Sequence, residues 1–188
     1  MITVKAAAPD EGQQYFVLIF DCGGDHQVRT RLKEEHQGLT EAGYEKIICI
    51  RDVRPDFSRA EIAQLAAGLE KGLIPGLVPV DFILSTMELE AWFLAEFNHY
   101  VKIDPLITNE AIFAAIGFDP AIDDPATRDE PANDLRQCYA LGGKTYEKSE
   151  SGRTISALDY AYIYTNLVCR IPEIQRIANH IDEFLTPA

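Results

Sequence analysis

Residues Lys46–Asp56 read KIICIRDVRPD, and this stretch decides the predicted fold. The apolar run Ile47–Ile50 stops at Arg51 and Asp52, and a charged loop with a proline follows. This pattern is typical of a buried strand that ends in a loop. In a doubly wound α/β sheet, ligands bind in the crevice beyond the carboxyl ends of the strands. The acidic residues after this strand are therefore candidates for a functional site.

Two further apolar stretches, Tyr15–Phe20 and Val80–Leu84, predict strands, and helical patterns separate the three strands along the chain. Parallel neighbours require a long connection, usually a helix, so this alternation predicts an α/β fold with a parallel sheet flanked by helices. Parallel strands end at the same edge of a sheet. We therefore expect Asp21, Asp52 and the segment Ser85–Glu90 to converge there.

Capping signals predict where several helices begin. Ser58 and Glu61 have the spacing of a capping box, and Ser85 with Glu88 repeats it. Asp25 stands at the N-cap position of the helix that follows the first strand. For Glu88 and Asp25 a role in a site remains the alternative to a structural role.

The second half of the chain is predicted to be helical. Residues 1–100 are expected to form the α/β core and residues 101–188 a C-terminal helical cover, within one compact domain. Helices are predicted at Asn109–Ile116, near Thr154–Cys169 and near Pro172–Phe184, with an acidic solvated loop at Gly117–Asp134.

Glu90 lies in a predicted helix that has almost no polar face. Its helical neighbours include Ala91 and Leu94, and an ionised carboxylate among them needs a cation or a metal ion nearby. The structural alternative is an ion pair with Arg51 or Arg54. The sequence alone leaves both interpretations open.

Composition limits the classes of function. The formal net charge of −13 over 188 residues argues against a broadly basic nucleic-acid-binding face. Four scattered cysteines without a CxxC pair indicate reduced thiols, and no apolar run is long enough to cross a bilayer. We expect a cytoplasmic protein without a membrane partner. Carboxylates without a histidine cluster favour a hard cation, Mg²⁺ or Mn²⁺.

Three features together resemble an uncharacterised branch of the TOPRIM (topoisomerase–primase) superfamily. They are the sequence ELEAWFL at Glu88–Leu94, an acidic residue after each of two strands, and a later Tyr146-x-Lys148. Relatives of this branch include overcoming-lysogenisation-defect type nucleases and proteins encoded beside ATPases in bacterial defence loci. The resemblance spans most of the chain and implies a TOPRIM/Rossmann-like fold.

The resemblance also implies roles for individual residues. The catalytic residues would be Asp21, Glu90 and Lys148, phosphate would be held by Arg54 or Lys148, and the metal ligands would be Asp21, Asp52, Asp56 and Glu90. Two departures from the family pattern are present. Asp21 replaces a glutamate that is one methylene longer, and three residues separate Asp52 from Asp56 where the family has one.

Two hypotheses of different classes follow. The first is a magnesium-dependent, nuclease-like protein of phage defence that processes phosphodiesters, with nucleic acid, a partner ATPase and a second copy of the chain as expected partners. The second is a TOPRIM-derived interaction module without catalysis, in which Arg51, Arg54 and Arg59 neutralise the acids.

Overall fold

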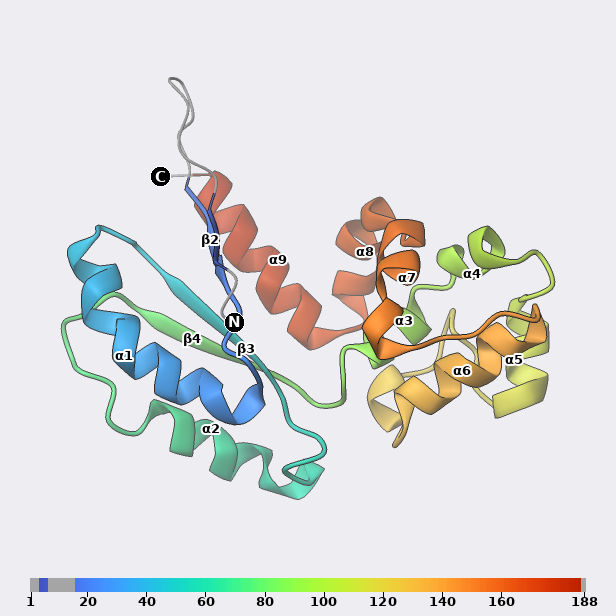
Figure 1. Cartoon of the computed structure of the whole chain (residues 1–188), viewed down its shortest axis with the longest axis horizontal. Helices are drawn as coiled ribbons and strands as arrows, with labels where there is room; N and C mark the ends of the chain where they lie inside the picture. Colours follow the sequence, from blue (N-terminus) through green and yellow to red (C-terminus); the bar gives the residue numbers. More distant parts are fainter. Residues whose placement is uncertain (1–3, 7–15, 187–188) are drawn as a thin grey trace. The chain divides into compact units, whose positions relative to one another are not determined.

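A computed structural model describes residues 4–6 and 16–186 of the chain (Figure 1). The strands are β1 Val4–Ala6, β2 Leu18–Phe20, β3 Ile47–Asp52 and β4 Val80–Ser85. The α-helices are α1 Val28–Glu41, α2 Ile62–Glu70, α3 Glu90–Ala95, α4 Asn98–Ile103, α5 Asn109–Ile116, α6 Pro131–Leu141, α7 Gly152–Ala157, α8 Tyr160–Thr165 and α9 Pro172–Leu185. Short 3-10 helices are η1 Asp25–Gln27, η2 Arg59–Glu61, η3 Pro125–Thr127, η4 Lys148–Glu150 and η5 Leu167–Cys169.

The chain divides into two compact units. Unit 1 comprises Met1–Arg51 and Ala63–Phe82, and unit 2 comprises Asp52–Ile62 and Ile83–Ala188. The loop that follows β3 thus belongs to unit 2, together with α3 and the helices after it. This division differs from the predicted boundary at residue 100, because residues 83–100 pack with the C-terminal helices.

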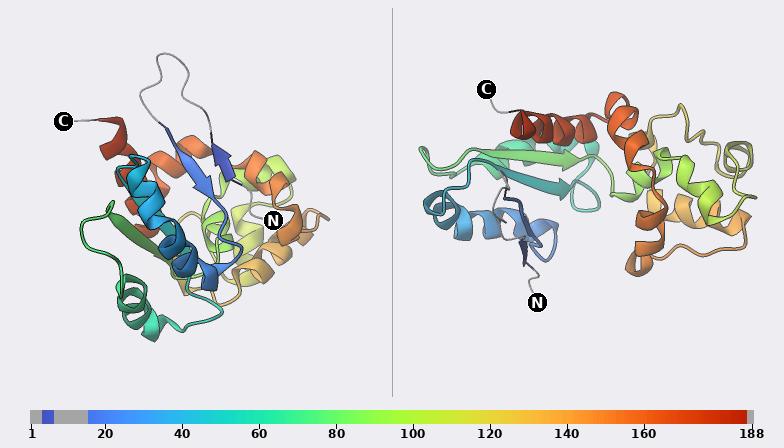
Figure 2. Two further views of the ribbon diagram at one scale, coloured as in Figure 1. Left: turned by 60° about the vertical axis from the view of Figure 1, so that its left-hand side comes forward. Right: turned by 90° about the horizontal axis from the view of Figure 1, so that it is seen from above.

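The parallel part of the fold is the strand pair β3–β4. The backbone N–H of Ile47 donates to Pro79 O (2.9 Å) at one end, and that of Val53 donates to Ser85 O (2.8 Å) at the other. The right-hand view of Figure 2 shows both arrows pointing the same way. The protein is therefore α/β, as predicted.

The predicted three-stranded parallel sheet is wrong for the described residues. Strand β2 pairs antiparallel with β1, in the register Val4 with Phe20, and is not part of the β3–β4 sheet. Only Leu18–Phe20 of the predicted first strand is extended in the sheet, and Tyr15 lies outside the described residues. Hydrophobic patterning finds a strand but does not choose its partner, because pairing is non-local.

Strand β3 is also less buried than its apolar run predicted. Burial alternates along it, and Ile48 and Ile50 are 38% and 49% exposed. One face of the strand is therefore exposed to solvent. A continuous apolar run predicts burial on both faces only where both faces are covered.

The helices of unit 1 agree largely with the predicted pattern. Helix α1 buries Val28 and Leu32. The capping box of Ser58 and Glu61 is confirmed: the Glu61 carboxylate accepts from the Ser58 backbone N–H at 2.9 Å, immediately before α2. The N-cap prediction for Asp25 is wrong, because η1 starts at Asp25 and its N-cap is Gly24.

Unit 2 is helical around an aromatic core. Tyr100, Tyr139, Tyr146, Phe93 and Phe118 are all buried in one cluster. Helix α6 contacts both α3 and α5 (Figure 1). The helix after the third strand, which is predicted to have almost no polar face, is α3, and nearly all of its residues are buried.

The helix prediction in the second half of the chain is partly confirmed. Helix α5 matches the predicted range, with Thr108 as N-cap accepting from Ala111 N at 3.2 Å. The predicted helix near 154–169 is instead divided into α7, α8 and η5. The acidic segment 117–134 ends in a helix that was not predicted, α6, which begins at Pro131.

Candidate functional site

Glu90, the first residue of α3, is a buried carboxylate with two polar partners. Glu90 is only 7% exposed, so its ionised carboxylate needs a hydrogen-bond donor or a cation nearby. The hydroxyl of Tyr146 donates to Glu90 Oε1 at 2.9 Å. The ammonium of Lys148 lies 3.7 Å from Glu90 Oε2. The expected cation near Glu90 is therefore present, but it is Lys148 and not Arg51 or Arg54.

Several carboxylates surround the ammonium group of Lys148. Its Nζ lies 2.8 Å from Glu88 Oε1, closer than to Glu90. Burial acts to lower the pKa of Lys148, but the hydrogen bond to Glu88 and the charges of Glu90, Glu88 and Asp52 outweigh it and raise that pKa. We call Asp52, Glu88, Glu90 and Lys148 the acid–lysine cluster. Its lysine is protonated at neutral pH.

The position of Glu88 corrects a predicted cap. Helix α3 starts at Glu90 with Leu89 as N-cap, so Glu88 is not the third helical residue. Ser85 belongs to β4, and its hydroxyl donates to the backbone carbonyl of Met87 instead of capping the helix. The carboxylate of Glu88 is thus available to Lys148.

A cavity of about 360 Å³ opens beside the acid–lysine cluster within unit 2. Most of its lining is charged or polar, and it comes from the loop after β3, from Glu88 before α3, from α6 with the two residues before it, and from η4. The lining residues are Arg54, Pro55, Glu88, Asp129, Glu130, Ala132, Asn133, Arg136 and Lys148. Both residues predicted to hold phosphate, Arg54 and Lys148, line this cavity.

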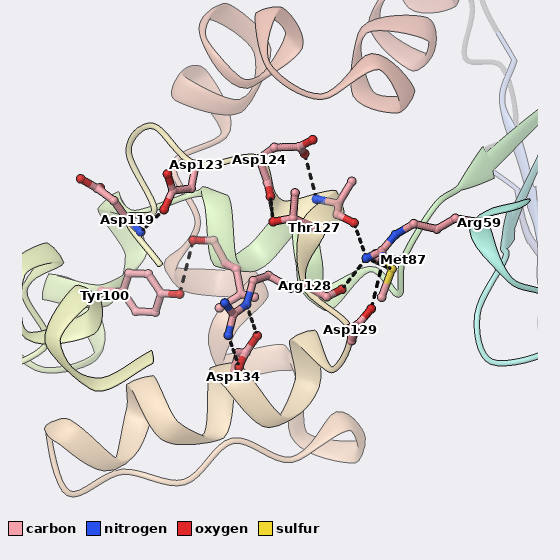
Figure 3. A network of polar contacts seen from close by, with 12 residues as sticks. Arg59, Met87, Tyr100, Asp119, Asp123, Asp124, Thr127, Arg128, Asp129 and Asp134 are labelled. Atoms are coloured by element: carbon pink, nitrogen blue, oxygen red, sulfur yellow. Dashed lines mark hydrogen bonds and ion pairs between the residues drawn. The ribbon is translucent and has the colours of Figure 1, made fainter. Parts of the chain in front are cut away.

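Two arginines fix the cavity wall formed by residues 126–136 (Figure 3). Arg59 Nη2 donates to Ala126 O at 2.6 Å, and its Nη1 lies 3.1 Å from the carboxylate of Asp129. Arg128 donates to both carboxylate oxygens of Asp134, at 2.7 and 3.0 Å. The second contact is bidentate, the strongest geometry for such a pair. The wall is therefore held from outside by Arg59 of η2 and internally by the pair of Arg128 with Asp134.

The structure brings together some of the predicted site residues and not others. Asp52, Glu90 and Lys148 share the acid–lysine cluster, and Arg54 lines the adjoining cavity. Asp56 is exposed and does not line the cavity. Asp21 belongs to unit 1, where its carboxylate accepts from Gly23 N at 2.8 Å in a local turn.

Sequence reasoning missed the cavity residues on and before α6. Asn133 and Arg136 lie on that helix, and Glu130 precedes it. A signal was present: Pro131 suits the first helical position, and Leu135 and Cys138 follow at helical spacing. The acidic residues nearby favoured a loop instead.

The carboxylates of the cluster are the donor type that Mg²⁺ prefers. Glu88 and Glu90 both approach one cation, the Lys148 ammonium, so the donors already converge on positive charge. Within residues 4–6 and 16–186, no group of three or more His, Cys, Asp or Glu side chains has metal-binding geometry.

Thiol chemistry is disfavoured at the two more buried cysteines. Burial raises the pKa of Cys49 and that of Cys138 to about 12 each. The thiolate is the nucleophilic form, so both thiols are unreactive at neutral pH. All four cysteines are free.

Searches for similar family models, curated proteins and solved structures found no match to this chain. Among the helices of the described residues, none combines the length and the apolar character that crossing a membrane requires.

Proposed function

We propose that this chain is a TOPRIM-like, metal-dependent protein that processes phosphodiesters, acting in the cytoplasm. The observation that carries the proposal is the placement of Glu88, Glu90 and Lys148 beside a cavity that Arg54 also lines. Carboxylates for a divalent cation and basic groups for a phosphate oxygen are the two components that phosphoryl chemistry needs.

The residues of unit 2 have separate roles in this proposal. Asp52, Glu88 and Glu90 would hold Mg²⁺ or Mn²⁺, with the exposed Asp56 as a further oxygen donor. When bound, the metal ion supplies charge stabilisation at a phosphate oxygen. Arg54 orients the phosphate through its planar fork of donors. Asp21, predicted as a ligand and as the general acid or base, belongs to unit 1 and has no role in this proposal.

Lys148 acts as a cation and hydrogen-bond donor in this site, not as a base. Its raised pKa keeps the ammonium protonated at neutral pH, mainly through the hydrogen bond to Glu88 that opposes the effect of burial. If Glu88 and Glu90 held a metal ion, the Lys148 ammonium would lose these partners and could turn toward the cavity that it lines. It can then contact phosphate beside Arg54.

The expected partners follow from charge. A net charge of −13 repels nucleic acid at long range, so a cationic surface from a second protein would assist binding. A partner ATPase is the proposed source of that surface, and a second copy of this chain is proposed as a further partner although it carries the same net charge. Copurification followed by light scattering tests both.

The second candidate is a TOPRIM-derived interaction module without catalysis. It is favoured by the ion pair at 2.8 Å between Lys148 and Glu88, which already neutralises one acid of the cluster. The engagement of Arg59 with Asp129 also favours a structural use of charge. This candidate predicts no response to divalent metal.

Calorimetric titration of Mg²⁺ and Mn²⁺ into the wild type and the Asp52→Asn and Glu90→Gln variants tests the first proposal. We expect binding that both variants weaken, and metal-dependent cleavage of a fluorescent oligonucleotide by the wild type. Glu150→Gln, an exposed acid in η4, is the matched control and should behave as wild type. No binding by any of the four proteins would favour the interaction module, and equal binding by all four would show that the metal ion binds away from Asp52 and Glu90.

A further inference from the structure

We propose that the cavity in unit 2 binds a phosphorylated ligand the size of one nucleotide, with Arg54 and Arg136 contacting the phosphate. The inference rests on the proposed function only in its choice of phosphate esters as ligands. It goes further by assigning a binding site that uses no metal ion and by selecting a single nucleotide over a duplex.

Arg54 is the cation in the cavity that is available to a ligand. Lys148 is engaged by Glu88 at 2.8 Å, and Arg136 lies 3.9 Å from Glu147, which is at the outer limit of an ion pair. Arg54 lines the cavity and makes no hydrogen bond or ion pair with any residue that the structure describes. A half-buried arginine in that state is suited to an external anion.

The remaining charges of the lining favour an anion. Asp129 is paired with Arg59 at 3.1 Å, and the pair of Glu88 with Lys148 is also internal. After these pairs are set aside, the lining retains Arg54 and Glu130, and Arg136 keeps only its long contact of 3.9 Å with Glu147. The planar guanidinium groups of two arginines match the geometry of phosphate oxygens, because each guanidinium can donate two parallel hydrogen bonds to them.

The other polar groups of the lining suit the rest of a nucleotide. The side chains of Glu130 and Asn133 make no hydrogen bond within the described residues. The Glu130 carboxylate can accept from sugar hydroxyls, and the Asn133 amide can both donate to and accept from a base edge. A nucleotide has sugar hydroxyls and a base edge and a bare phosphate ion has neither, so these two side chains favour a nucleotide.

Size and rigidity limit the ligand further. At about 360 Å³ the cavity is near the lower end of the roughly 300–1,000 Å³ that small-molecule sites occupy, so it can hold one nucleotide and not a duplex. The contacts of Arg59 and Arg128 fix the wall before any ligand arrives. A preformed wall reduces the entropy lost on binding.

The test is calorimetric titration of adenosine and thymidine 5′-monophosphates in EDTA. Adenosine and inorganic phosphate are titrated separately. We expect both monophosphates to bind, and adenosine and phosphate to bind more weakly by about tenfold or more. Arg54→Gln and Arg136→Gln should each weaken monophosphate binding by a similar factor. Arg153→Gln removes the same charge from an exposed position on α7 outside the cavity and should bind like wild type.

Four results would overturn the inference: no monophosphate binding, equal binding by adenosine, equal binding by phosphate, or equal losses in Arg54→Gln and Arg153→Gln. Circular dichroism and melting temperature confirm that each variant is folded. Because EDTA excludes metal, nucleotide binding can succeed when magnesium binding fails. If the wild type binds magnesium but does not bind a nucleotide, only this inference is rejected and the proposed function stands.

Discussion

The hydroxyl of Tyr146 donates a 2.9 Å hydrogen bond to the carboxylate of Glu90, and both residues are buried, at 2% and 7% exposed. This contact joins the segment before η4 to the start of α3. It also connects the aromatic core of unit 2 to the acid–lysine cluster, so the position of Glu90 depends on that core.

We expect Tyr146→Phe to lower the free energy of unfolding by about 1–3 kcal/mol, because a buried carboxylate loses its donor. Urea denaturation at pH 7 measures this loss. Tyr160→Phe is the matched control: its hydroxyl donates to Ile155 O at 2.9 Å, but the residue is 59% exposed. Equal effects of the two substitutions would contradict the buried role of Tyr146.

The same contact predicts a response to alkaline pH. Burial, followed by the hydrogen bond and charge of Glu90, raises the pKa of Tyr146 above its usual value of 10.0. A raised folded-state pKa means that this contribution to stability is complete below pH 10 and is lost as pH rises further. Stability measured from pH 9 upward should fall less steeply in Tyr146→Phe than in wild type. An equally steep fall of the free energy of unfolding in the two proteins would argue against a raised pKa of Tyr146.

Glu96 connects three helices through its carboxylate. Its oxygens accept from the backbone N–H groups of Asn98 (2.9 Å), His99 (3.1 Å) and Asp159 (3.2 Å), at the starts of α4 and α8. Burial acts to raise the pKa of Glu96, but the hydrogen bonds from His99 and from these backbone groups outweigh it and lower that pKa. The ionised form is therefore the one that folding favours.

Glu96→Gln should reduce the free energy of unfolding by about 1–3 kcal/mol at pH 7, since a neutral amide accepts these bonds less strongly. A lowered folded-state pKa means that the contribution exists above the unfolded value of 4.5 and is lost as pH falls. The difference between wild type and variant should therefore shrink below pH 4.5. Glu150→Gln, at an exposed position, should show no such difference.

Local features of this fold were predictable from sequence and long-range partners were not. The capping box at Ser58 and the extent of α5 depend on residues three to eight positions apart, so composition and spacing are enough to predict them. Strand β2 was recognised, but its pairing with β1 was not, since the choice of partner involves distant residues. The same reason explains why Glu90 was known to need a cation while Lys148 was not identified as that cation.

The position of Lys148 predicts competition with metal. Its ammonium lies 2.8 Å from Glu88 and 3.7 Å from Glu90, so a divalent ion at these carboxylates must displace it. Under the proposed function, Lys148→Met should strengthen Mg²⁺ binding. Because the side chain is 49% exposed, the pair contributes no more than about 1 kcal/mol and the gain should not exceed about fivefold. Weaker binding in the variant would show that Lys148 assists the metal.

Arg59 provides the last prediction, which concerns the cavity wall. Its guanidinium contacts Ala126 O at 2.6 Å and Asp129 at 3.1 Å, and so holds the segment 125–130 against η2. Arg59→Ala should increase amide hydrogen exchange in that segment by about tenfold, because local opening needs less free energy once these contacts are lost.

Hydrogen exchange followed by mass spectrometry measures the effect on peptides that cover 125–130. Arg31→Ala is the matched control, since Arg31 pairs with Glu34 on its own helix α1, at 2.7 Å. Nucleotide binding should weaken in Arg59→Ala although Arg59 does not line the cavity, because a loosened wall must be ordered when the ligand binds. Unchanged exchange in 125–130 would show that Arg128 and Asp134 hold the wall without Arg59.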